Sequence, residues 1–226
     1  MIASISAKFK LLLILSVCVG LGLVVGRLGT DIWSSTKDAL FSGSQEYFSS
    51  NELLLEKYQE AKVTALDWQS LLPSNELDVI TKYQGIKSQD SADMSSQILR
   101  SIEAATDPEY KAALQSTNVV GAYQDQIVAI SGFIVPIDYY PDKTVKNMFL
   151  VPYFGACLHF PPPPPNQIIF ATLEAGFKSL ELNQAYTLTG EIKLGLFEDP
   201  MGTSAYRLDV ISIAAFNGQP DDVRRH

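Results

Sequence analysis

The pattern of hydrophobic and polar residues changes near residue 118 and divides the chain into two parts. Before that point, apolar residues recur every three or four positions, which is typical of amphipathic helices. Beyond it, short runs of β-branched and aromatic residues are separated by Gly, Pro, Asn and Asp, which is typical of strands and turns. The chain is therefore predicted to be α+β, with a short helical segment over residues 28–117 and a β domain over residues 118–216.

Helix-start signals recur in the first part of the chain. Ser50 or Asn51 can cap a helix in the apolar run that follows, and Ser74 can cap a short helix that reaches Ile80. Asp107 stands at a cap position before a proline and a glutamate, which predicts a helix from the next residue to about Gln115.

The second part contains five strand-like runs, which is the number of strands in an oligonucleotide/oligosaccharide-binding (OB) barrel. Gly132 and Gly190 lie inside two of the runs and are interpreted as bends where a small barrel turns a corner. Pro136 is expected to end the first strand, residues 197–202 to form the last turn, and residues 217–226 to be a flexible tail. The runs are Ile127–Val135, Met148–Val151, Ile168–Leu173, Tyr186–Leu194 and Tyr206–Ile213.

An uncharged apolar run over residues 11–26 follows Lys8 and Lys10 and precedes Arg27. The basic flank predicts that the rest of the chain lies across a membrane, outside the cytoplasm. The run is shorter than the roughly 20 residues of a straight span, so residues 1–27 can be a signal anchor or a cleaved signal peptide. No A-x-A cleavage site is present, which favours the anchor.

The composition narrows the class of protein. Lys and Arg number 17 against 25 Asp and Glu, and 46% of the residues are hydrophobic. A net charge of −8 argues against a nucleic-acid partner, because phosphate contacts need clustered basic residues. Two cysteines without a C-x-x-C pair exclude a disulfide-stapled scaffold.

The most unusual feature is the sequence VPYFGACLHFPPPPPNQ over residues 151–167. The prolines at 161–165 favour a stiff polyproline II rod of about 15 Å. Its simplest role is that of a rigid connector between two strands. The alternative is a docking site for an aromatic groove on another protein.

Cys157 and His159 stand two residues apart, so in an extended chain both side chains face the same side. A thiolate and an imidazole are suitable ligands for zinc or copper. Asp138 is predicted to join them, and water or a second copy of the chain in a homodimer can complete the site. Further candidate ligands are Glu198 and Asp199, with Met148 and Met201 for Cu(I).

Two other interpretations of the pair remain. Cys157 can be a thiol nucleophile beside His159, with Asp138 orienting the ring. The spacing places the two side chains parallel rather than hydrogen-bonded, and no oxyanion loop is evident. Alternatively, Cys157 is a small buried hydrophobe next to a hydrogen-bonded histidine. No catalytic residue is assigned, and an enzymatic activity is not predicted.

Three strings of this sequence resemble the bacterial family called domain of unknown function 3299 (DUF3299). They are Gly132–Asp138, Phe149–His159 and Pro161–Gln167, and the segment Leu66–Pro73, which contains a tryptophan interpreted as a packing side chain, is similar to the upstream motif of the family. The resemblance covers residues 64–216. It implies an export signal or lipid anchor and a place on the periplasmic side of the inner membrane.

The resemblance implies no established reaction. Some members are similar in lying beside genes for ABC-type transporters, and a role in zinc handling has been suggested for the family. We therefore expect an exported, membrane-tethered periplasmic binding or accessory protein that handles zinc for an envelope transporter, with the inner membrane and an ABC-type transporter as partners. The alternatives are a metal-free structural or interaction subunit of a transport complex and a thiol-dependent enzyme.

Overall fold

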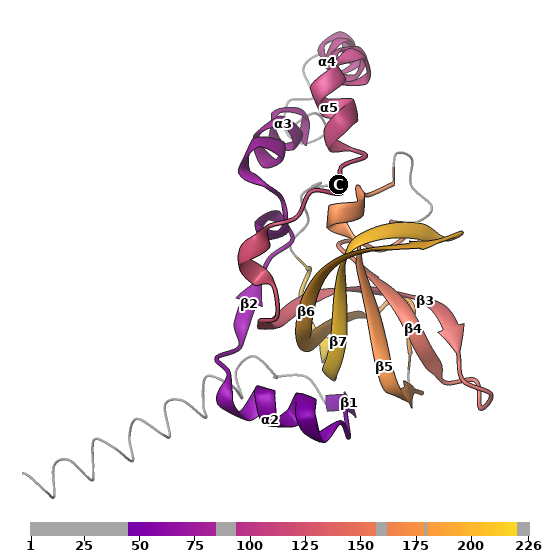
Figure 1. Ribbon diagram of the computed structural model, residues 1–226. Helices are drawn as coiled ribbons and strands as arrows, with labels where there is room; N and C mark the ends of the chain where they lie inside the picture. The colour runs from indigo at the N-terminus through magenta and orange to yellow at the C-terminus, as the bar shows by residue number, and fades with distance from the viewer. Residues whose placement is uncertain (1–44, 85–93, 157–161, 179, 221–226) are drawn as a thin grey trace, which may run out of the picture. The chain divides into compact units, whose positions relative to one another are not determined.

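The computed structural model of the chain describes residues 45–84, 94–156, 162–178 and 180–220 (Figure 1). All of these belong to one unit that extends from Gly43 to the C-terminus. The predicted N-terminal membrane or signal helix, Cys157 with His159, and most of the predicted tail lie outside the described residues. Within the described ranges, the helices are too short or too polar to cross a membrane.

Five strands close into a barrel. They are β3 (Ile127–Tyr139), β4 (Val145–Val151), β5 (Ile169–Phe177), β6 (Ala185–Asp199) and β7 (Gly202–Phe216). Strands β3, β4 and β5 pair antiparallel in chain order, β5 then pairs in parallel with β7, and β6 completes the ring by pairing with both β7 and β3. Buried aliphatic side chains from all five strands fill the interior. The predicted five-stranded barrel is confirmed.

The strands extend beyond the predicted runs, and two boundaries that the sequence had assigned to particular residues are corrected. Strand β3 does not end before Pro136 but continues through it to Tyr139. Its pairing with β4 shifts register between Pro136 and Asp138, and such a bulge accommodates a residue that has no backbone N–H. Strands β6 and β7 meet at Asp199 and Gly202, so the last turn is shorter than the expected residues 197–202.

Two short strands arise from the segment that was predicted to be helical. Strand β1 (Gln45–Phe48) pairs antiparallel with β7, and β2 (Thr64–Leu66) pairs in parallel with β3. Each is too short to show a clear alternation of polar and apolar residues. Their conformation is set by the barrel strands with which they pair, and the expectation of a purely helical segment is corrected accordingly.

The helices begin largely where the sequence predicted. The Asn51 side chain accepts a hydrogen bond from the backbone N–H of Leu54, and the Asp107 side chain accepts from the two residues that follow its proline. Ser74 is the first residue of its helix, which extends beyond Ile80. The helices are α2 (Glu52–Glu60), α3 (Ser74–Gln84), α4 (Met94–Thr106) and α5 (Pro108–Ala113), with 3-10 turns η1 (Gln69–Leu71), η3 (Gly121–Tyr123) and η4 (Pro165–Gln167).

Candidate functional site

The candidate site is the proline motif, residues 153–167, together with the residues that hold its two flanks. Cys157 and His159 lie outside the described residues, so their role as metal ligands stays a prediction. The structure describes the flanks on either side of them, residues 153–156 and 162–167. These flanks determine where the motif enters and leaves the barrel.

The first flank is packed against one face of the barrel. Tyr153 and Ala156 are buried in an apolar cluster, and exposed Phe154 makes an edge-to-face contact with Phe133 of β3 at 5.8 Å between ring centroids. Gly155 has a φ of 74°, a left-handed conformation that favours glycine. The chain therefore leaves β4 through a turn that is fixed by packing. The remaining buried members of the cluster are Phe149, Val151, Ile168 and Phe170.

The last residue of the second flank is tied to the barrel through a tryptophan. The Gln167 Nε2 donates a hydrogen bond of 2.7 Å to the carbonyl of Trp68, and the Trp68 Nε1 donates one of 2.7 Å to the carbonyl of Ser131 in β3. Trp68 is only 1% exposed and belongs to the main core. The interpretation of Trp68 as a packing side chain is confirmed, and it also carries polar anchors for the motif.

A buried carboxylate holds the neighbouring residue, Asn166. The Asn166 Nδ2 donates to Glu76 Oε2 at 2.8 Å and to the carbonyl of Asn118 at 3.0 Å. The other carboxylate oxygen of Glu76 accepts from Ser116 Oγ at 2.7 Å and Asn118 Nδ2 at 2.6 Å. Glu76 is 6% exposed, and such a buried carboxylate needs these donors in place of water. The network joins α3 to the end of the motif.

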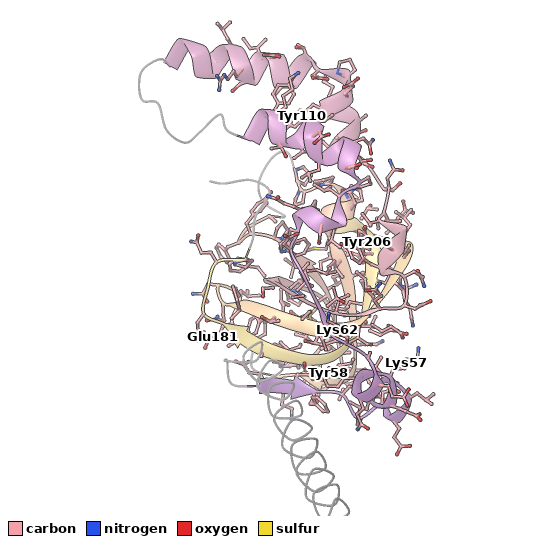
Figure 2. The ribbon with its side chains drawn as sticks, turned by 90° about the vertical axis from the view of Figure 1, so that its left-hand side faces the viewer. Lys57, Tyr58, Lys62, Tyr110, Glu181 and Tyr206 are labelled. Carbon is pink, nitrogen blue, oxygen red and sulfur yellow. The ribbon has the colours of Figure 1, made fainter. Side chains whose placement is uncertain are left out.

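Tyr206 of β7 connects the same region to the barrel, at the end that faces the helix of Tyr110 (Figure 2). Its hydroxyl donates to the carbonyl of Leu71 at 2.8 Å and accepts from the backbone N–H of Val120 at 2.7 Å. Burial raises the pKa of Tyr206 to about 12, against the lowering effect of the Val120 hydrogen bond. The phenol is therefore neutral at physiological pH and acts as a fixed donor.

Two polar atoms of the motif are buried without a hydrogen bond in the described part of the chain. They are the side-chain oxygens of Asn166 and Gln167. The amide nitrogens of both residues are already used by the anchors described above, which fixes the orientation of each amide. Buried acceptors of this kind are uncommon in folded proteins and identify a place where water or another donor can bind.

Asp138, the predicted third ligand, is engaged elsewhere. Its carboxylate lies 3.5 Å from Lys146 Nζ and accepts a 3.4 Å hydrogen bond from Asn147 Nδ2. Asp138 pairs in register with Asn147, four residues before the end of β4 at Val151 and therefore about 13 Å along the strand. A cluster of three or more metal-ligating side chains is absent among the residues that the structure describes.

The other candidate ligands are divided between the core and the last turn. Met148 is fully buried in the core, whereas Met201 is 54% exposed in the turn between β6 and β7, beside Glu198 and Asp199. The structure thus brings neither Asp138 nor these residues into a common cluster. Metal binding by Asp138 stays a prediction.

Four residues that hold the motif in place were not predicted as site residues. Glu76 reads as an ordinary first-turn acid of a helix, Ser116 and Asn118 as loop residues, and Tyr206 as an aromatic residue of a strand. None has a characteristic spacing from the motif. A polar residue at a position that helical periodicity assigns to the core is the only signal that points to Glu76.

Comparison with known proteins identifies the family. Residues 68–215 match the model described as protein of unknown function (DUF3299), a range that contains the framework from Trp68 to Tyr206. No curated protein matches the chain. A crystal structure of a DUF3299 family protein from Pseudomonas aeruginosa PAO1 is 26% identical, covers 70% of this chain and 99% of that chain, and has a TM-score of 0.49. The family model spans more than half of the sequence, and the chain therefore belongs to the DUF3299 family.

Proposed function

We propose that the chain is an exported, membrane-tethered binding protein that holds a transition metal, zinc in particular, through Cys157 and His159. It works on the periplasmic side of the inner membrane and serves an envelope transporter of the ABC type. The observation that carries this proposal is the anchoring of both flanks of the segment that contains the two ligands. Ala156 is fully buried on one side, and Asn166 and Gln167 are buried and hydrogen-bonded on the other.

Anchored flanks favour a metal site for a physical reason. A binding segment whose ends are already fixed loses less conformational entropy when it closes around an ion. Thiolate and imidazole together match the preference of zinc. Two protein ligands leave positions for water, for Asp138 or for a second copy of the chain. Such an incomplete site releases its ion more readily than a closed structural site. Ready release is what a protein that delivers zinc to a transporter requires.

The barrel supports a binding role rather than an enzymatic one. Its pairing order, with consecutive antiparallel strands followed by a parallel pair of β5 and β7, supports the expectation of an OB-like barrel. OB barrels bind their ligands on one face of the sheet and through the loops that border it. The tether in this proposal is the apolar N-terminal run, which carries the barrel outside the cytoplasm.

The test is a count of metal ions in the purified full chain. The chain has two cysteines and two histidines, so Cys18→Ala and His226→Ala are matched controls for Cys157→Ala and His159→Ala. We expect elemental mass spectrometry of chelator-free protein to find zinc in the parent chain and both controls, and none in the two motif variants. No metal in the parent chain after addition of zinc, or equal loss in the controls, would contradict the proposal.

A metal-free interaction subunit is the second candidate, and one observation favours it. Trp68 of the upstream segment and Asn166 and Gln167 of the proline motif are all engaged in buried structural contacts. On this hypothesis the motif preserves the shape of a docking module. Co-purification of a permease with the parent chain and equally with Cys157→Ala, in the absence of bound metal, would support this second function over the first.

A further inference from the structure

A pocket of about 380 Å³ lies between α2 and strands β5, β6 and β7. It is lined by described residues, and none of them belongs to the proline motif. Pockets that bind small molecules begin near this volume, at about 300 Å³. Its charged lining comes from four elements and consists of Lys57, Glu174, Glu191, Lys193 and Asp209.

The barrel surface beneath α2 is polar. In the register of β6 and β7, Glu191 lies opposite Asp209 and Thr189 lies opposite Ser212. Strand β7 advances three residues where β6 advances two, so a bulge keeps these polar partners on one face. Thr189 and Ser212 are buried, and their hydroxyls have no hydrogen bond within the described residues.

Helix α2 contacts the barrel through a half-buried face that includes Leu54, Leu55 and Tyr58. A surface helix normally buries an apolar stripe, yet α2 buries none of its own residues. Leu53 is 74% exposed although it lines the pocket. The helix is also connected to the barrel by Lys57, whose Nζ lies 2.5 Å from Glu191 Oε1. The space between the helix and the barrel is the pocket, whose lining includes the apolar residues Leu53, Leu54, Leu173 and Val210 as well as the charged residues.

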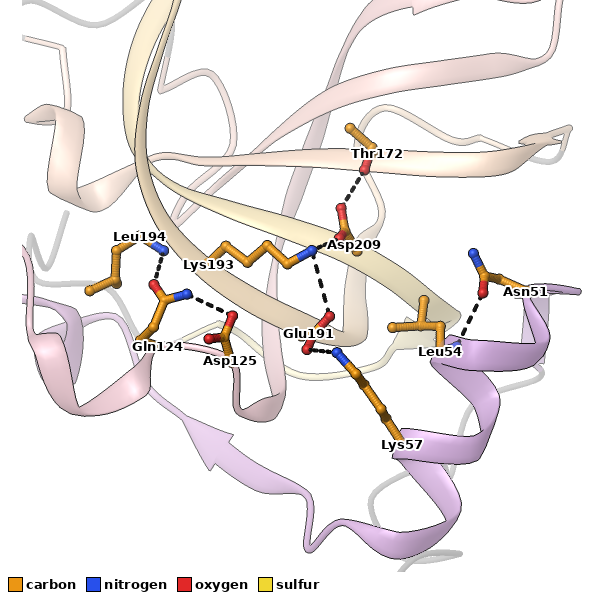
Figure 3. A network of polar contacts seen from close by, with 10 residues as sticks. All are labelled: Asn51, Leu54, Lys57, Gln124, Asp125, Thr172, Glu191, Lys193, Leu194 and Asp209. Atoms are coloured by element: carbon orange, nitrogen blue, oxygen red, sulfur yellow. Dashed lines mark hydrogen bonds and ion pairs between the residues drawn. The ribbon is translucent and has the colours of Figure 1, made fainter.

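Two ammonium groups converge on one side of the pocket (Figure 3). Lys193 Nζ lies 2.5 Å from Asp209 Oδ2 and 3.6 Å from Glu191 Oε2, while Lys57 contacts the other oxygen of Glu191. The Glu191 side chain is 5% exposed, whereas Lys57 is 58% and Lys193 is 42% exposed. The hydrogen bond to Asp209 raises the pKa of Lys193. Both lysine side chains are therefore accessible to a ligand.

A carboxylate stands on the other side. Glu174 is exposed on β5, and β7 separates β5 from the β6 strand that carries Lys193. Its Oε2 accepts a 3.2 Å hydrogen bond from Ser49 Oγ, a neutral partner. Among the residues that the structure describes, Glu174 forms no ion pair. Its negative charge faces the pocket without a cation.

We infer that this pocket binds a small zwitterion of the amino-acid class. The ligand ammonium pairs with Glu174, the ligand carboxylate pairs with Lys57 and Lys193, and a short apolar side chain contacts Leu53 and Leu54. The lining has two ammonium groups and three carboxylates, so a purely anionic ligand is repelled by the net negative charge, and a purely cationic ligand makes no contact with the two lysines. Only a molecule with both charges satisfies both sides of the pocket.

The test is isothermal titration calorimetry of the full chain with three matched probes. These are L-leucine, 3-methylbutylamine, which lacks the carboxylate, and 4-methylpentanoate, which lacks the ammonium. We expect L-leucine to bind and each single-charge probe to bind at least about tenfold more weakly. Absence of heat with L-leucine at millimolar concentration, or equal binding of either single-charge probe, would overturn the inference.

Substitutions of pocket residues test whether L-leucine binds in this pocket. Lys57→Gln and Glu174→Gln should each weaken L-leucine about tenfold, whereas exposed Lys62→Gln and Glu181→Gln, outside the pocket, should not (Figure 2). If Lys57→Gln unfolds, Glu174→Gln alone decides, since Glu174 is exposed and makes no ion pair within the described residues. Unchanged affinity in Glu174→Gln would overturn the inference. The same titration on Cys157→Ala separates this result from the metal proposal, which it does not require.

Discussion

The indole of Trp68 occupies the space that a side chain at Gly132 would need. A Cβ atom placed on Gly132 would lie 2.9 Å from Trp68 Cζ2 and 2.6 Å from the carbonyl oxygen of Val151. The carbonyl of Ser131, next to Gly132, accepts the indole N–H. This glycine was predicted to mark a bend of the barrel. In the structure it permits the close approach of the tryptophan to which the motif is anchored.

Gly132→Ala should therefore destabilise the protein. The added methyl group meets backbone on one side and a fully packed ring on the other, so we expect the free energy of unfolding to fall by about 1–3 kcal/mol. Gly121→Ala is the matched control, because nothing lies within 4 Å of a Cβ at that position. Chemical denaturation of both variants measures the difference, and equal effects would contradict the packing account.

Glu76→Gln tests the buried carboxylate network. The substitution replaces one acceptor oxygen by an NH₂ group, which then faces either the donors of Ser116 and Asn118 or the donor of Asn166. We expect the free energy of unfolding to fall by about 1–3 kcal/mol. Asp78→Asn, on the exposed side of the same helix, should change it far less. A neutral effect at Glu76 would show that the network does not hold α3 to the motif.

Tyr206→Phe removes a hydroxyl that joins Leu71 to Val120. Loss of both hydrogen bonds should cost about 1–3 kcal/mol of unfolding free energy at neutral pH. The folded protein raises the pKa of Tyr206 from 10.0 to about 12, which favours the neutral phenol. The associated stability is present below pH 10 and is lost as pH rises toward 12. The difference between the parent chain and Tyr206→Phe should therefore shrink over this range, and a constant difference would contradict the assignment.

Gln167→Ala tests whether the hydrogen bonds that anchor the proline motif also support the proposed metal site. Without its hydrogen bond to Trp68, the end of the motif is less fixed, and we expect zinc affinity to fall roughly tenfold, as with other residues that orient metal ligands. Gln184→Ala is the control, since that amide donates to Ala185 and Phe216 outside the motif. Competition titrations with a chromophoric chelator compare the two variants, with circular dichroism to verify folding. Equal zinc affinities of Gln167→Ala and Gln184→Ala would show that the anchor at Gln167 does not support metal binding.

The barrel could be predicted because its strands carry strong local signals. Runs such as Ile127–Val135 and Tyr206–Ile213 are rich in β-branched and aromatic residues, and each lies inside an observed strand. Strand ends were less predictable. Pro136 lacks a backbone N–H, yet the strand continues through it because the pairing with β4 contains a bulge there. This bulge depends on the partner strand, so the local sequence does not predict it.

The site could be predicted only in part. The motif itself is continuous in sequence, so Asn166 and Gln167 were found with it. Their partners are distant, and Glu76 is 90 residues from Asn166, so only the fold brings them together. Tyr206 has the pattern of an ordinary strand residue, and the only local signal at Glu76 is a polar side chain at a core position of its helix. Contacts of this kind depend on tertiary structure, which local patterns do not encode.

X-ray absorption spectroscopy at the zinc edge tests whether Cys157 and His159 bind one metal ion together. For the zinc-loaded full chain we predict sulfur at roughly 2.3 Å and imidazole nitrogen at roughly 2.0–2.1 Å in equal numbers, with oxygen in any remaining position. Equal numbers hold for a single chain and for a homodimeric site. A spectrum without sulfur, or one that is unchanged in Cys157→Ala, would contradict the account.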